Sequence, residues 1–138
     1  MWLEQLARTA NRTDAYEFPF DRNQLDFRPL LQSVIEDRLR GRLPSEIARS
    51  FQRGIAHGLA VAIESGCKTH NIDTTVLSGG VFQNELLLED LSAILKPSPF
   101  TVWNNRDVPA NDGGISLGQA ALAAFGHFDS VTPEAAHA

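Results

Sequence analysis

The stretch from Val76 to Ala124 constrains the fold of this chain most, because it carries strand, glycine-turn and helix signals in close succession. The first strand is expected at Thr74 to Leu77, where a run of β-forming residues stops at Ser78-Gly79-Gly80. A helix is expected from Gln83 to Leu95, and the prolines of Lys96-Pro97-Ser98-Pro99 end it. Its apolar face is formed by Leu87, Leu91, Ile94 and Leu95.

A second strand is expected at Phe100 to Trp103, and after a loop the last helix is expected from Asp112 to about Phe125. This order of strands and helices predicts an α/β fold with helices packed on a small sheet. The tail from Asp129 onward is polar and small, so we expect residues 129–138 to be disordered.

The first half of the chain is predicted to be mainly helical. Met1 to Ala10 is expected to form a short helix, and Tyr16 to Phe20 a short edge strand. A helix from Pro29 to about Arg40 should be closed by a glycine, Gly41. The longest helix is expected from Pro44 to about Gly66, with one buried stripe of apolar residues at intervals of four: Ile47, Phe51, Ile55, Leu59 and Ile63. Small residues would let another backbone approach it closely: Gly54, Ala56, Gly58, Ala60 and Ala62.

The turn at Ser78-Gly79-Gly80 is the first candidate site. A glycine pair between a strand and a helix lets backbone N–H groups approach an anion, and the start of the helix adds a partial positive charge. The turn is not a P-loop, because no Gly-Lys-Ser/Thr follows. Glycine also serves such turns for steric reasons alone, and Asn84 suits ligand binding and helix capping equally well.

The second candidate site is Asn111-Asp112-Gly113-Gly114. Two glycines in the first turn of a helix cost up to about 1 kcal/mol each relative to alanine. A chain tolerates this cost where a ligand or another backbone must pack closely. The carboxylate of Asp112 suits a hard cation near a phosphate, but it suits capping of the helix equally well.

Composition excludes several other classes of function. A net charge of −5 argues against sequence-independent binding to nucleic acid, which needs Lys and Arg to neutralise phosphates. The single cysteine, Cys67, excludes an internal disulfide and a cysteine-based zinc site. No apolar run is long enough to span a membrane, and the N-terminus lacks the layout of a signal peptide. We therefore expect a cytoplasmic protein that contacts neither membrane nor nucleic acid directly.

Two segments resemble one known family. LSGGVFQNELLLEDL, from Leu77 to Leu91, and VPANDGGISLGQAALAA, from Val108 to Ala124, closely resemble the C-terminal part of the hydrogenase-maturation carbamoyltransferases (HypF). LDFRPLLQSVIEDRLRG and PSEIARSF look like the same region, so the resemblance covers Met1 to about Phe125. The spacing of the two glycine motifs also resembles the related tRNA threonylcarbamoyl-transferring enzymes (TsaD).

This resemblance implies a fold, an activity and roles for particular residues. Both groups share the two-lobed actin and sugar-kinase fold (ribonuclease-H-like), so residues 1–128 are expected to form a single C-terminal lobe of it. The intact enzyme would bind an ATP-derived carbamoyl-adenylate between its lobes and pass the carbamoyl group to the C-terminal cysteine of a HypE-like partner protein. Gly79 and Gly80 would line the nucleotide phosphate, Asn84 would contact the nucleotide, and Asp112 would bind a divalent metal (Fe, Zn or Mg). No residue is assigned as catalytic.

The sequence departs from the family pattern in two ways. The His-x-x-x-His pair that the preceding lobe supplies to the metal is absent, as are the acylphosphatase-like, zinc-binding and adenylate-forming regions. We therefore expect weak metal binding and no turnover by this chain alone. Gln52 stands where the family usually has histidine, and Ser50-Phe51-Gln52 instead resembles the tRNA-modifying relatives.

Three hypotheses follow. The leading one is a transferase lobe that supplies half of a nucleotide and metal site. The alternatives are a non-catalytic nucleotide- or partner-binding module and a relative of the tRNA-modifying enzymes. A single lobe should also expose apolar surface that its other half would cover, so we expect self-association through the small-residue helix faces.

Overall fold

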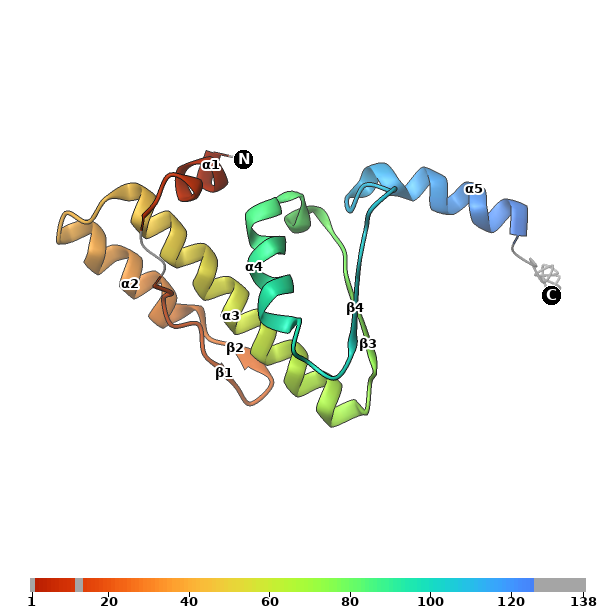
Figure 1. The fold of residues 1–138 in the computed structure, drawn as a ribbon, viewed down its shortest axis with the longest axis horizontal. Coiled ribbons are helices and arrows are strands. Elements are labelled where there is room, and N and C mark those ends of the chain that lie inside the picture. Colours follow the sequence, from red (N-terminus) through yellow and green to blue (C-terminus); the bar gives the residue numbers. More distant parts are fainter. Residues whose placement is uncertain (1, 12–13, 126–138) are drawn as a thin grey trace, which may run out of the picture.

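The structure of the protein is a computed structural model that describes residues 2–11 and 14–125 (Figure 1). The tail expected to be disordered, residues 129–138, lies outside this described part. The described elements, in chain order, are α1 (Trp2–Arg8), β1 (Phe20–Asp21), β2 (Gln24–Leu25), α2 (Phe27–Leu39), α3 (Pro44–His70), β3 (Thr74–Leu77), the 3₁₀ turn η1 (Gly80–Gln83), α4 (Glu85–Leu95), β4 (Thr101–Asn104), the 3₁₀ turn η2 (Asp112–Gly114) and α5 (Ile115–Phe125).

The long helix α3 is the element against which most others pack (Figure 1). It begins at Pro44, as predicted, because proline is favoured in the first turn, where its missing N–H is not needed. It continues one turn beyond the predicted end at Gly66 and stops at His70. The stop comes at Asn71, which takes the left-handed conformation (φ 53°) and donates its N–H to the carbonyl of Cys67. Asparagine adopts this conformation more readily than most residues, so the helix ends there.

The helix predicted to end at Gly41 is confirmed as α2. Its first residue follows Asp26, whose carboxylate accepts a hydrogen bond from the N–H of Arg28 and so caps the helix. Gly41 has a φ of +79°, which only glycine adopts without strain, and its N–H bonds the carbonyl of Arg38. The chain therefore reverses sharply and places α2 beside α3.

The strand predicted from Tyr16 to Phe20 is wrong. Residues 16–19 lie in no strand; they run along α3, where the N–H of Tyr16 bonds the carbonyl of Ser50 at 3.1 Å. The ladder starts only at Phe20, in a two-residue hairpin of β1 with β2. Arg22 and Asn23 have φ values of 48° and 61°, as the tightest hairpin turns require. The alternating pattern indicated extended backbone correctly, but its partner is a helix.

Glycines on α3 explain how this segment fits. A Cβ atom at Gly54 would lie 2.6 Å from the carbonyl oxygen of Tyr16, and one at Gly58 would lie 2.6 Å from that of Phe18. The close backbone approach expected for the small residues is therefore confirmed, with this chain's own segment as the partner. Since Gly54 and Gly58 are covered in this way, they are not the surface for self-association that the sequence suggested.

The predicted stripe on α3 is only partly correct. Ile47 is buried, but Phe51, Ile55 and Ile63 are half-buried. The most buried positions of the helix are small or polar: Ser50, Gln52, Gly54, Ala56, Gly58 and Ala60. Ala56 and Ala60 let α4 approach closely, and the resulting main core joins them to Leu77, Leu87, Leu91 and Leu95.

One polar cluster holds the loop before β1 against α2 and α3. The guanidinium of Arg42, which is nearly buried, pairs with Asp14 at 2.7 Å, Asp37 at 2.6 Å and Glu46 at 3.2 Å. The hydroxyl of Tyr16 donates to Asp37 at 2.6 Å. Burial, together with this bond, raises the pKa of Tyr16 to about 12. The segment next to Gly54 is therefore fixed at its backbone and at its side chain.

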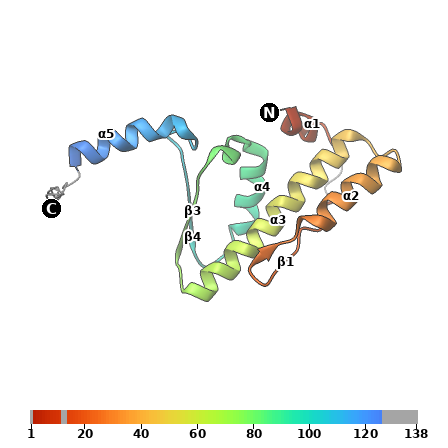
Figure 2. The same cartoon turned by 180° about the vertical axis from the view of Figure 1, so that it is seen from behind.

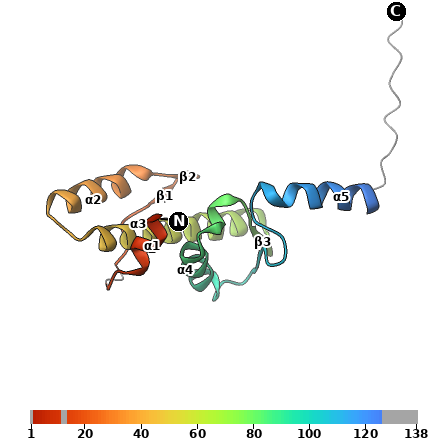
Figure 3. The ribbon, with the colours of Figure 1, turned by 90° about the horizontal axis from the view of Figure 1, so that it is seen from above.

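The predicted second strand is confirmed as β4, which pairs with β3 in parallel. Leu77 faces α3 and α4 and is buried, whereas Val76 and its cross-strand partner Trp103 are each 63% exposed. The pair thus has one covered face and one open apolar face. Beyond it, α5 leads away from the other elements (Figures 2 and 3). Its apolar residues are exposed: Ile115, Leu117, Leu122 and Phe125.

Among residues 2–11 and 14–125, no helix has both the length and the apolar character needed to cross a bilayer.

Candidate functional site

The parallel pairing of β3 and β4 brings the two candidate motifs to the same edge of the sheet. In the register, Leu77 at the end of β3 lies opposite Asn104 at the end of β4. The glycine turn follows the first of these residues, and the loop to Asp112 follows the second (Figure 1). The carboxyl ends of parallel strands are where open α/β sheets bind ligands. The topology therefore places both motifs where a nucleotide site is expected.

The glycine turn is open to a ligand. Gly79 has a φ of +105°, which explains the need for glycine at this position. A Cβ atom at Gly79 or Gly80 would meet no atom within 4 Å. The turn continues as η1, with the N–H of Phe82 bonded to the carbonyl of Gly79 at 3.0 Å. No described side chain fills the space beside the two glycines.

The start of α4, in contrast, is already supplied with acceptors. The side-chain oxygen of Asn84 accepts from the N–H of Leu87 at 3.1 Å, so Asn84 caps the helix. The carboxylate of Glu4 accepts from the N–H of Leu86 at 3.2 Å, although Glu4 lies 82 residues earlier. Two of the N–H groups that a phosphate would use are therefore occupied by this chain. An anion at this edge would bind at the glycine turn.

Asn84 takes the capping role that the sequence left open. Only 5% of the residue is exposed, and its oxygen is used within the helix. A contact between Asn84 and a nucleotide remains a prediction, and its amide nitrogen is the group left to make it.

Glu4 was missed by the sequence analysis. It lies in the predicted first helix, and no local pattern links it to α4. Burial alone would raise its pKa, but the bonds from the Leu86 N–H and from Arg8 outweigh burial and hold the pKa below the ordinary 4.5. Glu4 is thus ionised at neutral pH and sits at the positive end of α4.

The helix expected from Asp112 to about Phe125 starts differently: a 3₁₀ turn, η2 (Asp112–Gly114), precedes α5 (Ile115–Phe125). Its first turn, η2, is capped by Asn111, whose side-chain oxygen accepts from the N–H of Gly113 at 2.9 Å. The carboxylate of Asp112 is exposed and makes no hydrogen bond or ion pair with the described residues. Capping therefore does not use Asp112, and its charge remains available for a ligand.

The diglycine after Asp112 is explained by close packing of the preceding loop. A Cβ atom at Gly114 would lie 2.9 Å from the carbonyl oxygen of Pro109 and 2.9 Å from a methyl group of Val108. One at Gly113 would lie 2.9 Å from the side-chain oxygen of Asn111. Of the two partners that the sequence suggested, a ligand and another backbone, the structure shows the second.

Asp112 does not form a metal site with its neighbours. Among residues 2–11 and 14–125, no three His, Cys, Asp or Glu side chains are grouped closely enough to hold a metal ion. One exposed carboxylate provides a single ligand, whereas divalent cations take four or more in proteins. The described residues therefore do not fit a complete metal centre.

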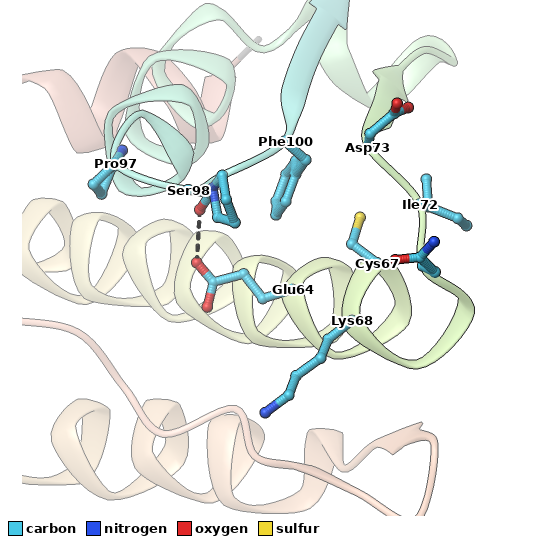
Figure 4. A pocket seen from close by; sticks show the side chains of 10 residues that line it. Glu64, Cys67, Lys68, Ile72, Asp73, Pro97, Ser98 and Phe100 are labelled. Atoms are coloured by element: carbon cyan, nitrogen blue, oxygen red, sulfur yellow. Dashed lines mark hydrogen bonds between the residues drawn. The ribbon is translucent and has the colours of Figure 1, made fainter.

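A hollow of about 680 Å³ lies at the opposite edge of the sheet, where β3 and β4 begin (Figure 4). The sulfur of Cys67 faces it near Phe100, and Ser98 donates a hydrogen bond to Glu64 at 2.9 Å. None of the four predicted site residues lines this hollow. It is separate from the candidate site.

Comparison with known proteins identifies the family. The model of the family described as "Carbamoyltransferase, Kae1-like Domain, second subdomain" matches residues 1–119. Carbamoyltransferase HypF of Rhizobium leguminosarum bv. viciae is 34% identical over 124 residues, which are 89% of this chain and 16% of that protein. Carbamoyltransferase HypF2 of Cupriavidus necator is 32% identical over 101 residues, which are 73% of this chain and 12% of that protein. The chain thus spans less than a fifth of the length of these relatives.

Solved structures agree with this match. A crystal structure of full-length HypF in the phosphate- and nucleotide-bound form superposes with a TM-score of 0.77 at 36% identity, covering 88% of this chain and 16% of that one. The crystal structure of T. kodakarensis HypF gives a TM-score of 0.76 at 26% identity, with the same coverage. The predicted fold, one lobe of the actin and sugar-kinase superfold, is confirmed.

Proposed function

The chain belongs to the HypF carbamoyltransferases, as the second subdomain of their Kae1-like domain, and from this we propose that it supplies half of a nucleotide site in [NiFe]-hydrogenase maturation. The single observation that carries the proposal is the shared sheet edge. There, the open turn at Gly79 and Gly80 follows one strand of the parallel pair, and the carboxylate of Asp112, which has no partner among the described residues, follows the other.

The substrate in this proposal is an ATP-derived carbamoyl-adenylate. Backbone N–H groups at Gly79 and Gly80 bind its phosphate, because the two residues carry no side chain that would keep a ligand away. Asn84 orients the nucleotide through its amide nitrogen. The C-terminal cysteine thiolate of a HypE-like partner attacks the carbamoyl carbon, the carbon–oxygen bond to the phosphate breaks, and AMP leaves with the electron pair.

Asp112 provides one ligand to a divalent cation (Fe, Zn or Mg) in the assembled site. A cation held there would neutralise negative charge on the phosphate. The remaining ligands must come from outside the described residues, since these form no complete metal centre. The chain alone is therefore inactive and binds ATP and metal weakly.

A matched pair of variants tests this role. In the full-length enzyme with its acceptor protein, Asp112→Ala should lower the rate of carbamoyl transfer at least tenfold. Loss of one charge-assisted contact corresponds to a change of about this size. Asp107→Ala removes an exposed carboxylate from the loop before η2 and should leave transfer unchanged. If the two variants behave alike, Asp112 has no role in transfer, and a non-catalytic binding module becomes the better description.

Calorimetry on the 138-residue chain provides a second test. Titration with ATP together with Mg²⁺, Fe²⁺ or Zn²⁺ should give weak binding, because Asp112 is a lone ligand. Tight binding of one metal ion per chain would contradict the half-site proposal.

The structure does not strengthen the hypothesis, based on Ser50-Phe51-Gln52, that the chain is a relative of the tRNA-modifying enzymes. Gln52 is only 2% exposed, so a substrate cannot reach it. The substitution relative to the family histidine therefore lies at a buried position. We retain hydrogenase maturation as the proposed process.

A further inference from the structure

A small cavity of about 200 Å³ lies between α3 and α4, away from the sheet edge that carries the candidate site. Three of its lining residues are polar: Arg53 and His57 come from α3, and Asp90 comes from α4. Its apolar wall is formed by Ala56, Ala93 and Ile94. Nothing in the proposed carbamoyl transfer uses these residues.

Arg53 is half-buried, and one nitrogen of its guanidinium, Nε, has no acceptor among the described residues. This Nε atom is itself buried. An ionised donor that is buried without a partner costs free energy, so native structures rarely leave one unpaired. Gln52, the preceding residue on α3, also has both side-chain polar atoms buried without partners in the described part of the chain. Gln52 does not line the cavity, so the donor without an acceptor there, among the described residues, is the Nε–H of Arg53.

Asp90 is not the missing acceptor for Arg53. Both of its carboxylate oxygens accept hydrogen bonds from the guanidinium of Arg49, one of them at 2.8 Å. Glu89, the next acidic side chain on α4, is largely exposed and lies within 4.0 Å of Arg8. The carboxylate of Asp90 is therefore paired with Arg49, and Arg53 lies one turn further along the same face of α3. His57 follows Arg53 at the next turn and is exposed.

We propose that this cavity binds a small oxyanion, namely a phosphate or phosphoryl group, held by Arg53 and His57. Such an anion has several acceptor oxygens, which suits a cavity with unused donors, and its charge complements the arginine. The apolar wall strengthens the attraction, because low-polarity surroundings reduce the screening of charge.

The test uses the full 138-residue chain labelled with ¹⁵N. The Nε–H resonance of Arg53, assigned by its loss in Arg53→Lys, should shift saturably as inorganic phosphate is added. Chloride at the same ionic strength should leave it in place. Absence of a saturable shift would mean that only water fills the cavity, and the proposal would be wrong.

Variants supply a second readout, the rise in the unfolding midpoint with phosphate concentration. Arg53→Gln and His57→Gln should each weaken the apparent affinity, the first by about tenfold. Lys68→Gln, an exposed cation on α3 outside the cavity, should respond as the wild type does. An equal loss in Lys68→Gln would show non-specific charge binding and overturn the proposal.

Two further experiments complete the test. One distinguishes a phosphoryl ester from free phosphate, and the other distinguishes this proposal from the proposed function. Competition by AMP at the Arg53 resonance would show that an esterified phosphoryl group enters the cavity, whereas a response to phosphate alone would identify the free anion. Asp112→Ala should keep the Arg53 response in full. The cavity and the nucleotide half-site can therefore fail or succeed independently.

Discussion

Gly54 is the position where a single added methyl group should test the packing of α3 most directly. An alanine Cβ would lie 2.6 Å from the carbonyl oxygen of Tyr16 and 2.9 Å from a methyl group of Leu30. The leucine can rotate, but the carbonyl belongs to a backbone that bonds Ser50, and the Tyr16 hydroxyl is fixed on Asp37. The segment therefore cannot move away without losing one of these bonds.

The magnitude follows from two opposing effects. Replacing glycine by alanine inside a helix stabilises it by up to about 1 kcal/mol. Overpacking costs about 1–3 kcal/mol, and a clash with fixed backbone belongs at the upper end of that range. We expect Gly54→Ala to lower the free energy of unfolding by about 1–2 kcal/mol, or the midpoint temperature by about 3–8 °C.

Gly66→Ala is the matched control, since Gly66 lies on the same helix and its added Cβ would meet no atom within 4 Å. It should raise the free energy of unfolding by about 0.5–1 kcal/mol. Urea unfolding followed by circular dichroism measures both variants under one condition. The difference between them isolates the steric cost, and equal stabilities would refute the close contact between Tyr16 and α3.

Three further predictions concern single groups and surfaces. Tyr16 is the only tyrosine, so tyrosinate absorbance should titrate near its pKa of about 12; a transition near the ordinary 10 would contradict its burial. Because the folded pKa is raised, the stability that Tyr16 contributes is present below pH 10 and is lost between about pH 10 and 12. Glu4 has a lowered pKa, so its contribution is present above pH 4.5 and is lost as the pH falls through the folded value. As the pH falls, the free energy of unfolding of Glu4→Gln should decrease less than that of the wild type. An equal decrease in the two proteins would argue against the bond to Leu86. Light scattering should detect self-association through the open sheet face and α5; Trp103→Thr should weaken it, and a monomer at high concentration would contradict it.

Local signals in the sequence were sufficient for most of the helices and for the parallel strands. Pro44 marked the start of α3, Gly41 marked the end of α2, and the prolines after Leu95 marked the end of α4. These residues act through the backbone of their own neighbourhood, so their effect is visible without knowledge of the fold. The end of α3 was predicted at about Gly66, one turn early, because the residue that closes the helix is Asn71 in the left-handed conformation, which asparagine adopts less often than glycine.

Contacts between distant parts of the chain could not be predicted in the same way. The small residues of α3 predicted a closely packed neighbour, but only the fold shows that this neighbour is the segment from Tyr16 to Phe18. Glu4 reaches Leu86 across 82 residues, and no pattern around either residue signals the other. At the second motif, Asn111 and Asp112 are both good caps, so the sequence could not decide which one would leave its side chain available.

Trp103, on the open face of the β3–β4 pair, also gives the protein a built-in optical reporter. The chain has only two tryptophans, and the other, Trp2, lies on α1, far from β4 in the sequence. An indole that is 63% exposed emits at long wavelength, and it shifts to shorter wavelength when apolar surface covers it. With Trp2→Phe as background, the emission of Trp103 would follow the docking of any partner on this face without an attached dye.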